Sequence, residues 1–584
     1  MIRLSFKRLL NRKGSTLTFL IALTALFALI PFGLQQSRDT KLAVDHSITE
    51  YGRGTYDLLV RPGGSRTETE KQLGMVEDNY IGDSQGGISI SEWEELKEME
   101  GIEVAAPVAS LGYFRGNQMS IELPRLPEPT RFTWQFFTSD GLTKYPISEP
   151  KSLVYFEETH PGLIQYIGNV KTRSQYISSF MNAFMPPSFY PLVAIDIESE
   201  EQLTGIDFSG FYLEDEQKKE ELLWLQTILE QYGNPPVIKV LKRDDLTIPL
   251  YLKIKAETLD VELEDYLEAF NLQESEWLMS IPDKEKLRNM FDMLQDEPIV
   301  EETEKEVDLS SLQSPFNGTP IQLNEAFEPS LIERYQADQD TAVYYVAKKI
   351  DYANLDQETP AVEIVKEGSP PAYKEVEQKG VSIYGATELP FVLFQAGTFS
   401  PKEQTNYLAA SPLGIYGDME AKTIDGQTLV PTTVPGSFIS APASGVTTLD
   451  SAEIIKGDKP IDAIRVRVAG IEGYDEEAQE KIDQVAKRLL EMGYEVDVVA
   501  GASFQEMTLD VEGIGFVNEQ WTTLGVAQEL GETWNSVTLL TTGLFVIFGI
   551  LWVMARLTFE KNVLRGENDL LFTLGWGKTR IQLR

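Results

Sequence analysis

Residues 464–499, IRVRVAGIEGYDEEAQEKIDQVAKRLLEMGYEVDVV, contain the clearest fold signal in this sequence. Aliphatic and basic residues alternate over 464–468, which predicts a half-exposed strand. Apolar residues then recur at the spacing of one helix face over about 475–492, and Gly493 ends that helix. Alternation returns over 494–499. The stretch therefore predicts a β-α-β unit and, with it, an α+β fold.

The same change of period occurs near the other end of the sequence. Ser91 opens the pattern S-E-W-E, a capping box with Glu94, and the helix is expected to run to Gly101. A short apolar strand over 102–106 should follow and end at Pro107. This helix and strand would belong to the same α+β domain as the later β-α-β unit.

The middle of the chain is less regular. Two further helices are predicted, over 214–232 and 283–296, and Gly233 with the Pro235-Pro236 pair ends the first of them. The acidic stretch 297–314 is poor in apolar residues and is expected to be a loop or linker. Residues 368–372, GSPPA, mark a second expected boundary.

Charge is distributed unevenly along the 584 residues, whose formal net charge is −40. The first 14 residues hold five basic residues and no acid, the last 29 are also net basic, and the part between them is strongly acidic. Phosphate contacts need clustered lysine and arginine, so we expect no nucleic-acid partner. The sequence has no cysteine, which excludes disulfides, thiol catalysis and cysteine-based zinc sites.

Two uncharged stretches of 20 residues flank the acidic part, at Ser15–Leu34 and Ser536–Ala555. As a helix each would be about 30 Å long, the thickness of the hydrocarbon core of a bilayer. The alternatives are a cleaved signal peptide for the first and a buried core helix for the second. The basic residues before the first stretch and after the second favour two transmembrane helices with both termini in the cytoplasm. We therefore expect a cell-membrane protein with an extracytoplasmic main domain.

Few residues in the sequence can carry catalytic chemistry. The only histidines, His46 and His160, lack neighbours with zinc-site spacing, and there is no G-x-S-x-G motif. Residues 577–579, Gly-Lys-Thr, end like a phosphate-binding loop, but Phe572 stands where that loop needs its first glycine. The acidic clusters lack the spacing of a calcium loop. We predict no catalytic residue, no metal and no cofactor, and therefore no enzyme activity in this chain.

The last twenty residues, 565–584, RGENDLLFTLGWGKTRIQLR, carry the most specific functional signal. Apolar residues and one acid line one side of a short predicted amphipathic helix, which Gly575 breaks, and basic residues follow. Taken alone, the segment also fits the basic flank of a membrane helix.

This segment resembles the loop after the second membrane helix of FtsX/MacB-type ABC transporter permeases. Glu567 matches the acid of the family pattern, residues 570–571 its apolar pair, residues 574–576 its Leu-Gly-Trp, and Ile581 its trailing aliphatic residue. Residues 88–107, ISISEWEELKEMEGIEVAAP, resemble a segment of the family's external domain, and the later β-α-β unit resembles another. The resemblance implies a segment that couples to an ATPase partner, formed by Glu567, Leu570, Leu571, Leu574, Gly575, Trp576, Lys578, Arg580 and Ile581.

The expected architecture follows from this resemblance. Two transmembrane α-helices would flank a large extracytoplasmic α+β domain of the MacB periplasmic-core type with an enlarged insertion. In chain order we expect a cytoplasmic amphipathic helix (1–14), a transmembrane helix (15–34), the extracytoplasmic domain (35–535), a transmembrane helix (536–555) and a cytoplasmic coupling segment (556–584). Within the domain, the expected parts are the core (about 35–115 and 375–515), the insertion (116–374) and a stalk helix (518–535).

The resemblance implies a permease subunit of an ABC transporter. Such a subunit couples ATP hydrolysis by a separate cytoplasmic ATPase dimer to movement of an extracytoplasmic domain, for export, lipoprotein handling or cell-envelope remodelling. The other expected partners are a second permease subunit, the lipid bilayer and an extracytoplasmic accessory protein. Because family members usually have four membrane helices, we expect this chain to be part of a longer permease or to have its missing half encoded separately. The alternative is a two-span membrane sensor or envelope-assembly protein without an ATPase partner.

Overall fold

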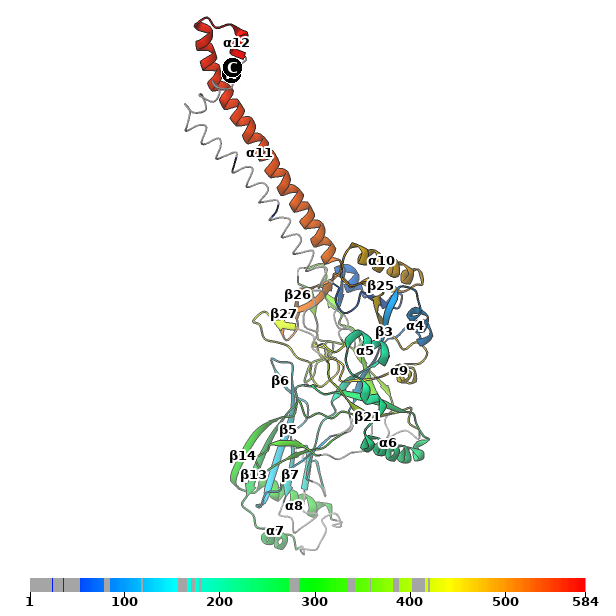
Figure 1. The fold of residues 1–584 in the computed structure, drawn as a ribbon. Coiled ribbons are helices and arrows are strands. Elements are labelled where there is room, and N and C mark those ends of the chain that lie inside the picture. The colour runs from blue at the N-terminus through cyan, green and yellow to red at the C-terminus, as the bar shows by residue number, and fades with distance from the viewer. Residues whose placement is uncertain are drawn as a thin grey trace. The chain divides into compact units, whose positions relative to one another are not determined.

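The fold is described from a computed structural model (Figure 1). It describes Thr24, Gln35 and residues 53–77, 85–116, 119–155, 165–169, 174–177, 181–271, 283–316, 318–332, 342–357, 359–381, 388–401, 415–417 and 421–582. The chain divides into two compact units, Arg53–Glu472 with Glu476–Leu524, called the body below, and a second unit that contains residues 525–584.

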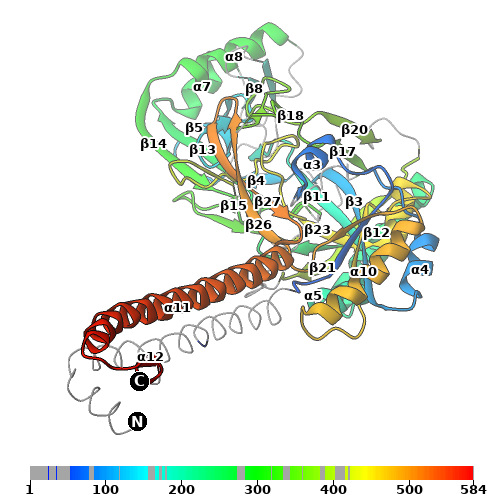
Figure 2. The same ribbon diagram turned by 90° about the horizontal axis from the view of Figure 1, so that it is seen from above.

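A ten-stranded mixed sheet organises the body. Its main path, in spatial order, is β21 (Val392–Phe399), β12 (Val237–Arg243), β23 (Gly445–Thr448), β11 (Phe189–Ile195), β3 (Ile102–Arg115), β24 (Ala463–Val468), β1 (Leu58–Arg61) and β25 (Glu495–Val498). Off this path, β17 (Val343–Ala347) pairs with β3, and β20 (Val376–Gly380) pairs with β17. Four helices pack against this sheet: α4 (Ile90–Lys97), α5 (Ile197–Thr204), α9 (Leu449–Lys456) and α10 (Glu476–Glu491) (Figures 1 and 2).

The predicted β-α-β unit is confirmed as β24, α10 and β25, and α10 buries its apolar face as its period requires. The two strands are not neighbours, however. Strand β1, more than 400 residues earlier in the sequence than β24, lies between them and pairs antiparallel with both. The unit is therefore a split β-α-β completed by an N-terminal strand.

The helix predicted near residue 91 is present, but it begins two residues earlier. Ser89 is the N-cap and forms the capping box with Glu92, so the prediction that Ser91 caps the helix was wrong. The repeat Ser-x-Ser-Glu-x-Glu offers two capping boxes, and the structure uses the first. The following strand, β3, does not end at Pro107 but continues to Arg115.

A second sheet of seven strands has a core of its own. It contains β14 (Ile299–Asp308), β13 (Tyr251–Leu259), β5 (Thr130–Ser139), β7 (Lys151–Tyr155), β8 (Gln165–Asn169), β9 (Ser174–Ile177) and β6 (Lys144–Pro146). Its core is shared with a small four-stranded sheet of β10 (Asn182–Phe184), β4 (Ser120–Glu122), β15 (Ile321–Leu323) and β16 (Pro329–Leu331). The prediction that the acidic stretch 297–314 is a loop or linker was wrong over Ile299–Asp308, which form strand β14.

All these strands come from within 116–374, the predicted insertion. Strands β11, β12 and β17 come from the same range, yet they pair in the ten-stranded sheet. The main sheet thus draws on both the expected core and the expected insertion.

A third sheet of six strands completes the body. It consists of β18 (Tyr352–Ala353), β19 (Ala361–Val362), β26 (Ser503–Val511), β27 (Gly515–Thr523), β2 (Met75–Glu77) and β22 (Ala421–Thr423), packed around Trp521. The stalk helix predicted from about 518 is therefore strand as far as Thr523. Helix α11 begins only at Val526 and runs to Thr573.

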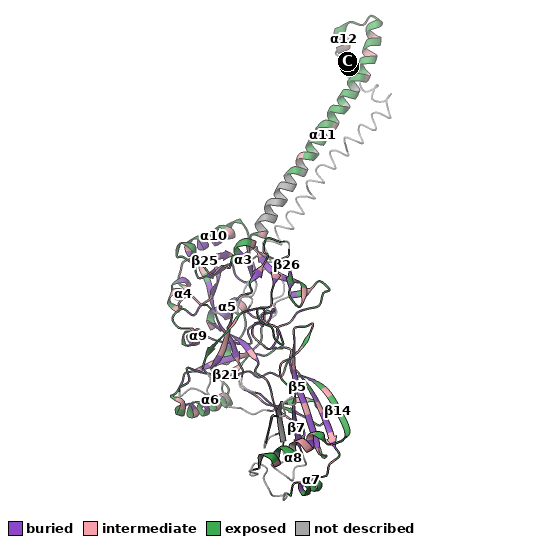
Figure 3. Ribbon diagram, turned by 180° about the vertical axis from the view of Figure 1, so that it is seen from behind, coloured by how far each residue is buried: buried purple, intermediate pink, exposed green. Residues whose placement is uncertain are grey.

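The remaining described helices are short, apart from α6 and α8. They are α3 (Glu68–Leu73), the 3₁₀ turns η1 (Ser209–Tyr212) and η2 (Glu230–Tyr232), α6 (Glu216–Leu229), α7 (Leu263–Ala269), α8 (Lys284–Asp296) and α12 (Lys578–Gln582). The helices predicted over 214–232 and 283–296 are confirmed, with Asp215 and Asp283 as N-caps. Figure 3 shows that buried residues concentrate in the sheets, whereas α6 is mostly exposed or intermediate and the described side chains of α11 are largely exposed.

Among the residues that the structure describes, none forms a helix with both the length and the apolar content needed to cross a membrane. A span needs about 20 consecutive, predominantly apolar residues in one helix. This finding contradicts the predicted pair of transmembrane helices, and with it the membrane fold class and the cell-membrane localisation with cytoplasmic termini. Residues 15–34 lie outside the described residues except for Thr24, as does the predicted helix over 1–14, and residues 536–555 are part of α11.

Candidate functional site

The predicted coupling segment forms the end of α11, a short connection and α12. Glu567, Leu570 and Leu571 lie in the last two turns of a 48-residue helix rather than in a short helix of their own. Leu574 is the C-cap, and Gly575 adopts a left-handed conformation with φ 84°. The helix therefore breaks at the glycine that the sequence indicated.

Backbone hydrogen bonds fix the geometry of this break. The N–H of Trp576 donates to the carbonyl of Leu571 at 3.1 Å, and the N–H of Gly575 donates to that of Phe572 at 3.0 Å. This 6→1 and 5→2 pair is a Schellman motif, which favours glycine at the left-handed position. After the turn, the N–H of Ile581 in α12 donates to the carbonyl of Gly577, the residue before that helix, at 3.2 Å.

The segment presents large apolar side chains to solvent. Leu570 is 64% exposed, Leu574 is 68% exposed and Trp576 is 48% exposed. Lys578 is exposed as well, whereas Glu567, Leu571 and Ile581 are half-buried. The backbone of Arg580 lies in α12. Since Glu567, Leu570, Leu571 and Leu574 fall within about 100° of one another on a helical wheel, they share one face.

Other exposed apolar side chains lie further back along α11. Among the residues between Leu540 and Phe559 whose side chains the structure describes, eleven large apolar ones are exposed, including Phe548, Leu551 and Met554. Exposed apolar surface of this extent marks a contact region rather than ordinary surface.

The Gly-Lys-Thr ending at 577–579 does not build a nucleotide site. A phosphate-binding loop follows a strand and opens a helix, with its glycines providing a backbone cradle. Here the preceding element is the end of helix α11, and the following helix α12 has five residues. The segment is therefore not built to hold a nucleotide phosphate.

The body holds a second candidate site, an open cleft of about 880 Å³. It is lined by residues 61–69, 85–87, 348–351 and 492–494, together with Glu92 and Asp462. Its walls approach closely at glycines. A Cβ atom at Gly63 would lie 2.7 Å from the carbonyl oxygen of Gly493, and one at Gly87 would lie 2.8 Å from the Pro62 ring. The loops can pack this closely because these positions carry no side chain.

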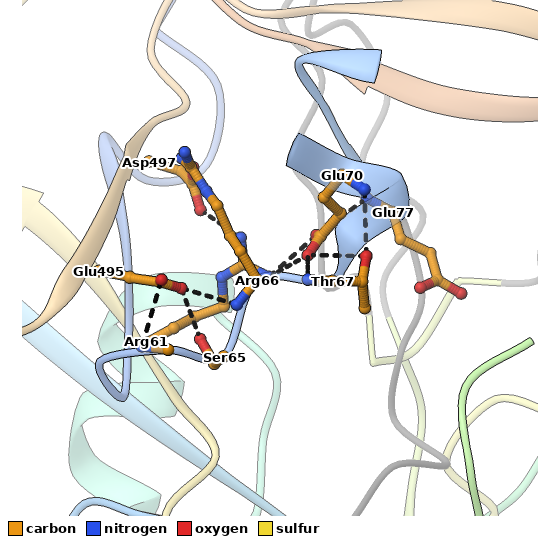
Figure 4. A network of polar contacts seen from close by, with 9 residues as sticks. Arg61, Ser65, Arg66, Thr67, Glu70, Glu77, Glu495 and Asp497 are labelled. Atoms are coloured by element: carbon orange, nitrogen blue, oxygen red, sulfur yellow. Dashed lines mark hydrogen bonds and ion pairs between the residues drawn. The ribbon is translucent and has the colours of Figure 1, made fainter. Parts of the chain in front are cut away.

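A buried ion network lies at the wall of this cleft (Figure 4). Arg61 in β1 is 1% exposed, and its Nη1 donates to both carboxylate oxygens of Glu70, at 2.9 and 3.1 Å. Its Nη2 donates to Asp497 in β25 at 2.7 Å, and Arg66 contacts the other oxygen of that carboxylate. Two fully buried acids therefore share one buried guanidinium.

Glu70 also holds the start of α3. Its carboxylate accepts the N–H of Thr67 at 2.9 Å while the Thr67 hydroxyl accepts the N–H of Glu70, a complete capping box. Burial raises the pKa of Glu70. The charges of Arg61 and Lys349 and the hydrogen bond from the Thr67 N–H lower it by more than burial raises it, so the pKa lies below its ordinary value. Glu70 is thus held ionised against its burial.

The glycine-containing loop between β1 and α3 is held by another acid. The carboxylate of Glu495 accepts from the N–H of Gly64 at 3.2 Å, the hydroxyl of Ser65 at 3.0 Å and the N–H of Arg66 at 2.7 Å. The donors of this loop that could bind an anion are therefore occupied by the protein's own carboxylate.

Sequence reasoning missed this cleft and its network. The local signals were the Thr67-x-x-Glu70 capping box, Arg61 at the end of the otherwise apolar strand β1, and Asp497 between two valines in β25. Neither signal reveals the partner, because Arg61 and Asp497 are 436 residues apart.

The described residues contain no group of three or more histidine, cysteine, aspartate or glutamate side chains suited to a metal ion. The two histidines, His46 and His160, lie outside the described part of the chain. The expectation that the chain is not an enzyme stays a prediction.

No family model, no curated protein and no solved structure matches this chain. The resemblance to FtsX/MacB-type permeases, the ATPase partner and the second subunit thus stay predictions carried by the short motifs quoted above.

Proposed function

We propose that this chain is a non-enzymatic coupling subunit of an ABC-type assembly. A separate ATPase binds the segment from Glu567 to Ile581, and its nucleotide cycle moves the body of this chain. The observation that carries the proposal is the exposed apolar face beside the glycine-terminated end of α11, at the residues that resemble the family's coupling loop.

The chemistry of the segment suits docking into a groove of a partner. Leu570, Leu571 and Leu574 recur at helical spacing, which is how an amphipathic helix anchors in an apolar groove. Trp576 adds a large aromatic side chain just beyond the helix end, the residue type most enriched among binding hot spots. The Schellman turn holds this tryptophan in a fixed relation to the leucines, so the partner meets a preformed surface.

Helix α11 connects the coupling segment to the body along the chain. Its 48 residues contain no proline and would be roughly 70 Å long at 1.5 Å per residue. It begins three residues after β27 ends, so the coupling segment and the third sheet of the body are joined by one continuous helix in the chain.

The test is recovery of an ABC ATPase with the full-length chain from its native source, comparing Leu570→Ala with Phe572→Ala. The two residues lie in the same turn and are 64% and 58% exposed, but Phe572 faces away from the predicted docking face. Alanine is a better helix former than either. We expect Leu570→Ala and Trp576→Ala each to weaken ATPase binding about tenfold or more, since hot-spot truncations cost at least 1–2 kcal/mol, and Phe572→Ala to leave it unchanged.

Equal recovery of the ATPase with all three variants would refute the assignment of this docking face. If the folded chain recovers no ABC ATPase at all, the proposal fails, and a sensor or assembly protein without an ATPase partner becomes the better interpretation.

A further inference from the structure

A buried acid of the third sheet lies outside the ion network of Arg61. Glu77 ends strand β2, opposite Trp521 of β27, and is 7% exposed. Its backbone N–H donates to Glu70 at 3.4 Å, but within the described residues its carboxylate makes no hydrogen bond or ion pair. In Figure 4 this carboxylate points away from the pairs that Arg61 forms.

Five titratable groups from different elements face Glu77. Lys349 follows β17, Lys374 precedes β20, Glu519 lies in β27, Glu70 lies in α3 and Tyr352 lies in β18. They have other partners. Glu519 accepts from the indole of Trp521 at 3.0 Å and from the Tyr352 hydroxyl at 3.2 Å, and Lys374 donates to Ser440.

Burial dominates the protonation of this acid. It raises the pKa of Glu77 to about 7, with Glu519 and Glu70 acting in the same direction and the two lysines opposing. The carboxyl therefore changes charge close to neutral pH, whereas an exposed glutamate does so near pH 4.5.

We propose that Glu77 is the proton-binding residue of a switch in the third sheet. The neutral carboxyl stays buried and allows β2 to pair with β27; when its O–H bond breaks and the proton passes to water, the carboxylate favours a state in which β2 has separated from β27. This inference does not depend on the proposed ATPase partner.

The β27 strand of the switch lies close in sequence to the start of α11, so a change in the switch can affect that helix. Strand β27 pairs with β2 through Trp521, Thr522 and Thr523, and α11 begins at Val526. A change in this pairing thus alters the last residues before α11.

The sign of the pH dependence is the reverse of that for an ordinary ion-paired glutamate. The closed sheet holds the proton up to about pH 7, and the open state loses it near pH 4.5. Opening of β2 therefore becomes easier as the pH rises from 4.5 to 7 and levels off above 7. Between its low-pH and high-pH limits the opening equilibrium changes by roughly 300-fold, and roughly 80-fold of this falls between pH 4.5 and 7, with a slope close to tenfold per pH unit in the middle of that window.

Hydrogen exchange of the full-length chain tests this, with each rate divided by the intrinsic rate at the same pH. In the wild type, protection of residues 75–77 and 521–523 should fall about tenfold per unit between pH 5 and 6.5 and level off above 7. Glu77→Gln should remove that slope. Glu68→Gln, at an exposed glutamate of the adjacent helix α3, is the matched control and should retain it.

Glu77→Asp provides a second variant in case glutamine disturbs the fold, because it keeps a titrating carboxyl and should keep a slope. A wild-type sheet whose protection does not change over this range overturns the proposal. So does an unchanged slope in Glu77→Gln, which would place the proton on another group.

Discussion

Replacing Arg61 with methionine tests the buried network most directly. Methionine has a similar length and no charge, so the substitution leaves Glu70 and Asp497 buried at 2% and 0% exposure without their shared guanidinium. Breaking a buried pair in this way costs about 3–5 kcal/mol, because the remaining charges stay desolvated. We expect the lower end, about 3 kcal/mol, since Arg66 still contacts Asp497 and the Thr67 N–H still donates to Glu70.

The assay is the local opening free energy of β1 and β25, taken from hydrogen exchange of the full-length chain at pH 7. The matched comparison is the triple variant Arg61→Met, Glu70→Gln, Asp497→Asn, which removes the charges of Arg61 and of both acids that it pairs with. Glutamine can still accept the Thr67 N–H, so the α3 cap survives. The triple variant should therefore lose at least 1 kcal/mol less than Arg61→Met alone, because no buried charge is left unpaired.

Lowering the pH should show further whether the charge of Glu70 causes the loss of stability in Arg61→Met. The pKa of Glu70 is lowered in the folded protein, so its contribution is present above its ordinary pKa of 4.5 and is lost as the pH falls through the folded value. Without Arg61 this gain disappears, and the difference between wild type and Arg61→Met should shrink below pH 4.5. Equal losses in the single and triple variants, or a loss below about 1 kcal/mol in Arg61→Met, would refute the view that charge pairing holds this region.

Three further predictions concern stability. Ser89→Ala should cost about 1 kcal/mol in the opening free energy of α4, whereas Ser91→Ala should cost less than about 0.5 kcal/mol, because only Ser89 caps the helix. Gly380→Ala should lower the melting temperature more than Gly426→Ala: both glycines have positive φ, but a Cβ at Gly380 would meet a backbone carbonyl oxygen, and one at Gly426 would meet nothing within 4 Å. Trp521→Ala should cost about 3–5 kcal/mol by urea unfolding, since the ring is 1% exposed in the centre of the third core.

Local sequence predicted those elements whose signals are complete within a few residues. Helices α6, α8 and α10 have their caps and apolar periods in one stretch, and the structure confirms them. Where two local signals overlapped, as at Ser89 and Ser91, sequence alone could not choose, because either serine has a glutamate three residues later.

Strand β14 shows why other assignments failed. Its sequence, IVEETEKEVD, suggested a solvated linker, since glutamate is a poor strand former. In the structure the neighbouring strand β13 supplies the compensating charges: Lys253 pairs with Glu304 at 2.7 Å and Lys255 with Glu302 at 3.6 Å. Cross-strand pairs of this kind stabilise a charged strand, but they become visible only when the pairing is known.

The two candidate sites also differ in how far local sequence reveals them. The end of α11 is encoded by residues 571–576, whose own hydrogen bonds place Gly575 and Trp576, so the sequence was enough to locate the helix break. The network of Arg61 requires β1, α3 and β25, with partners up to 436 residues apart, and no local pattern specifies that meeting. It follows that substitutions within 567–581 should act on partner binding with little effect on the body, whereas substitutions at Arg61, Glu70 or Asp497 should act on the stability of the body. Each set therefore serves as the control for the other when binding and folding are measured on the same variants.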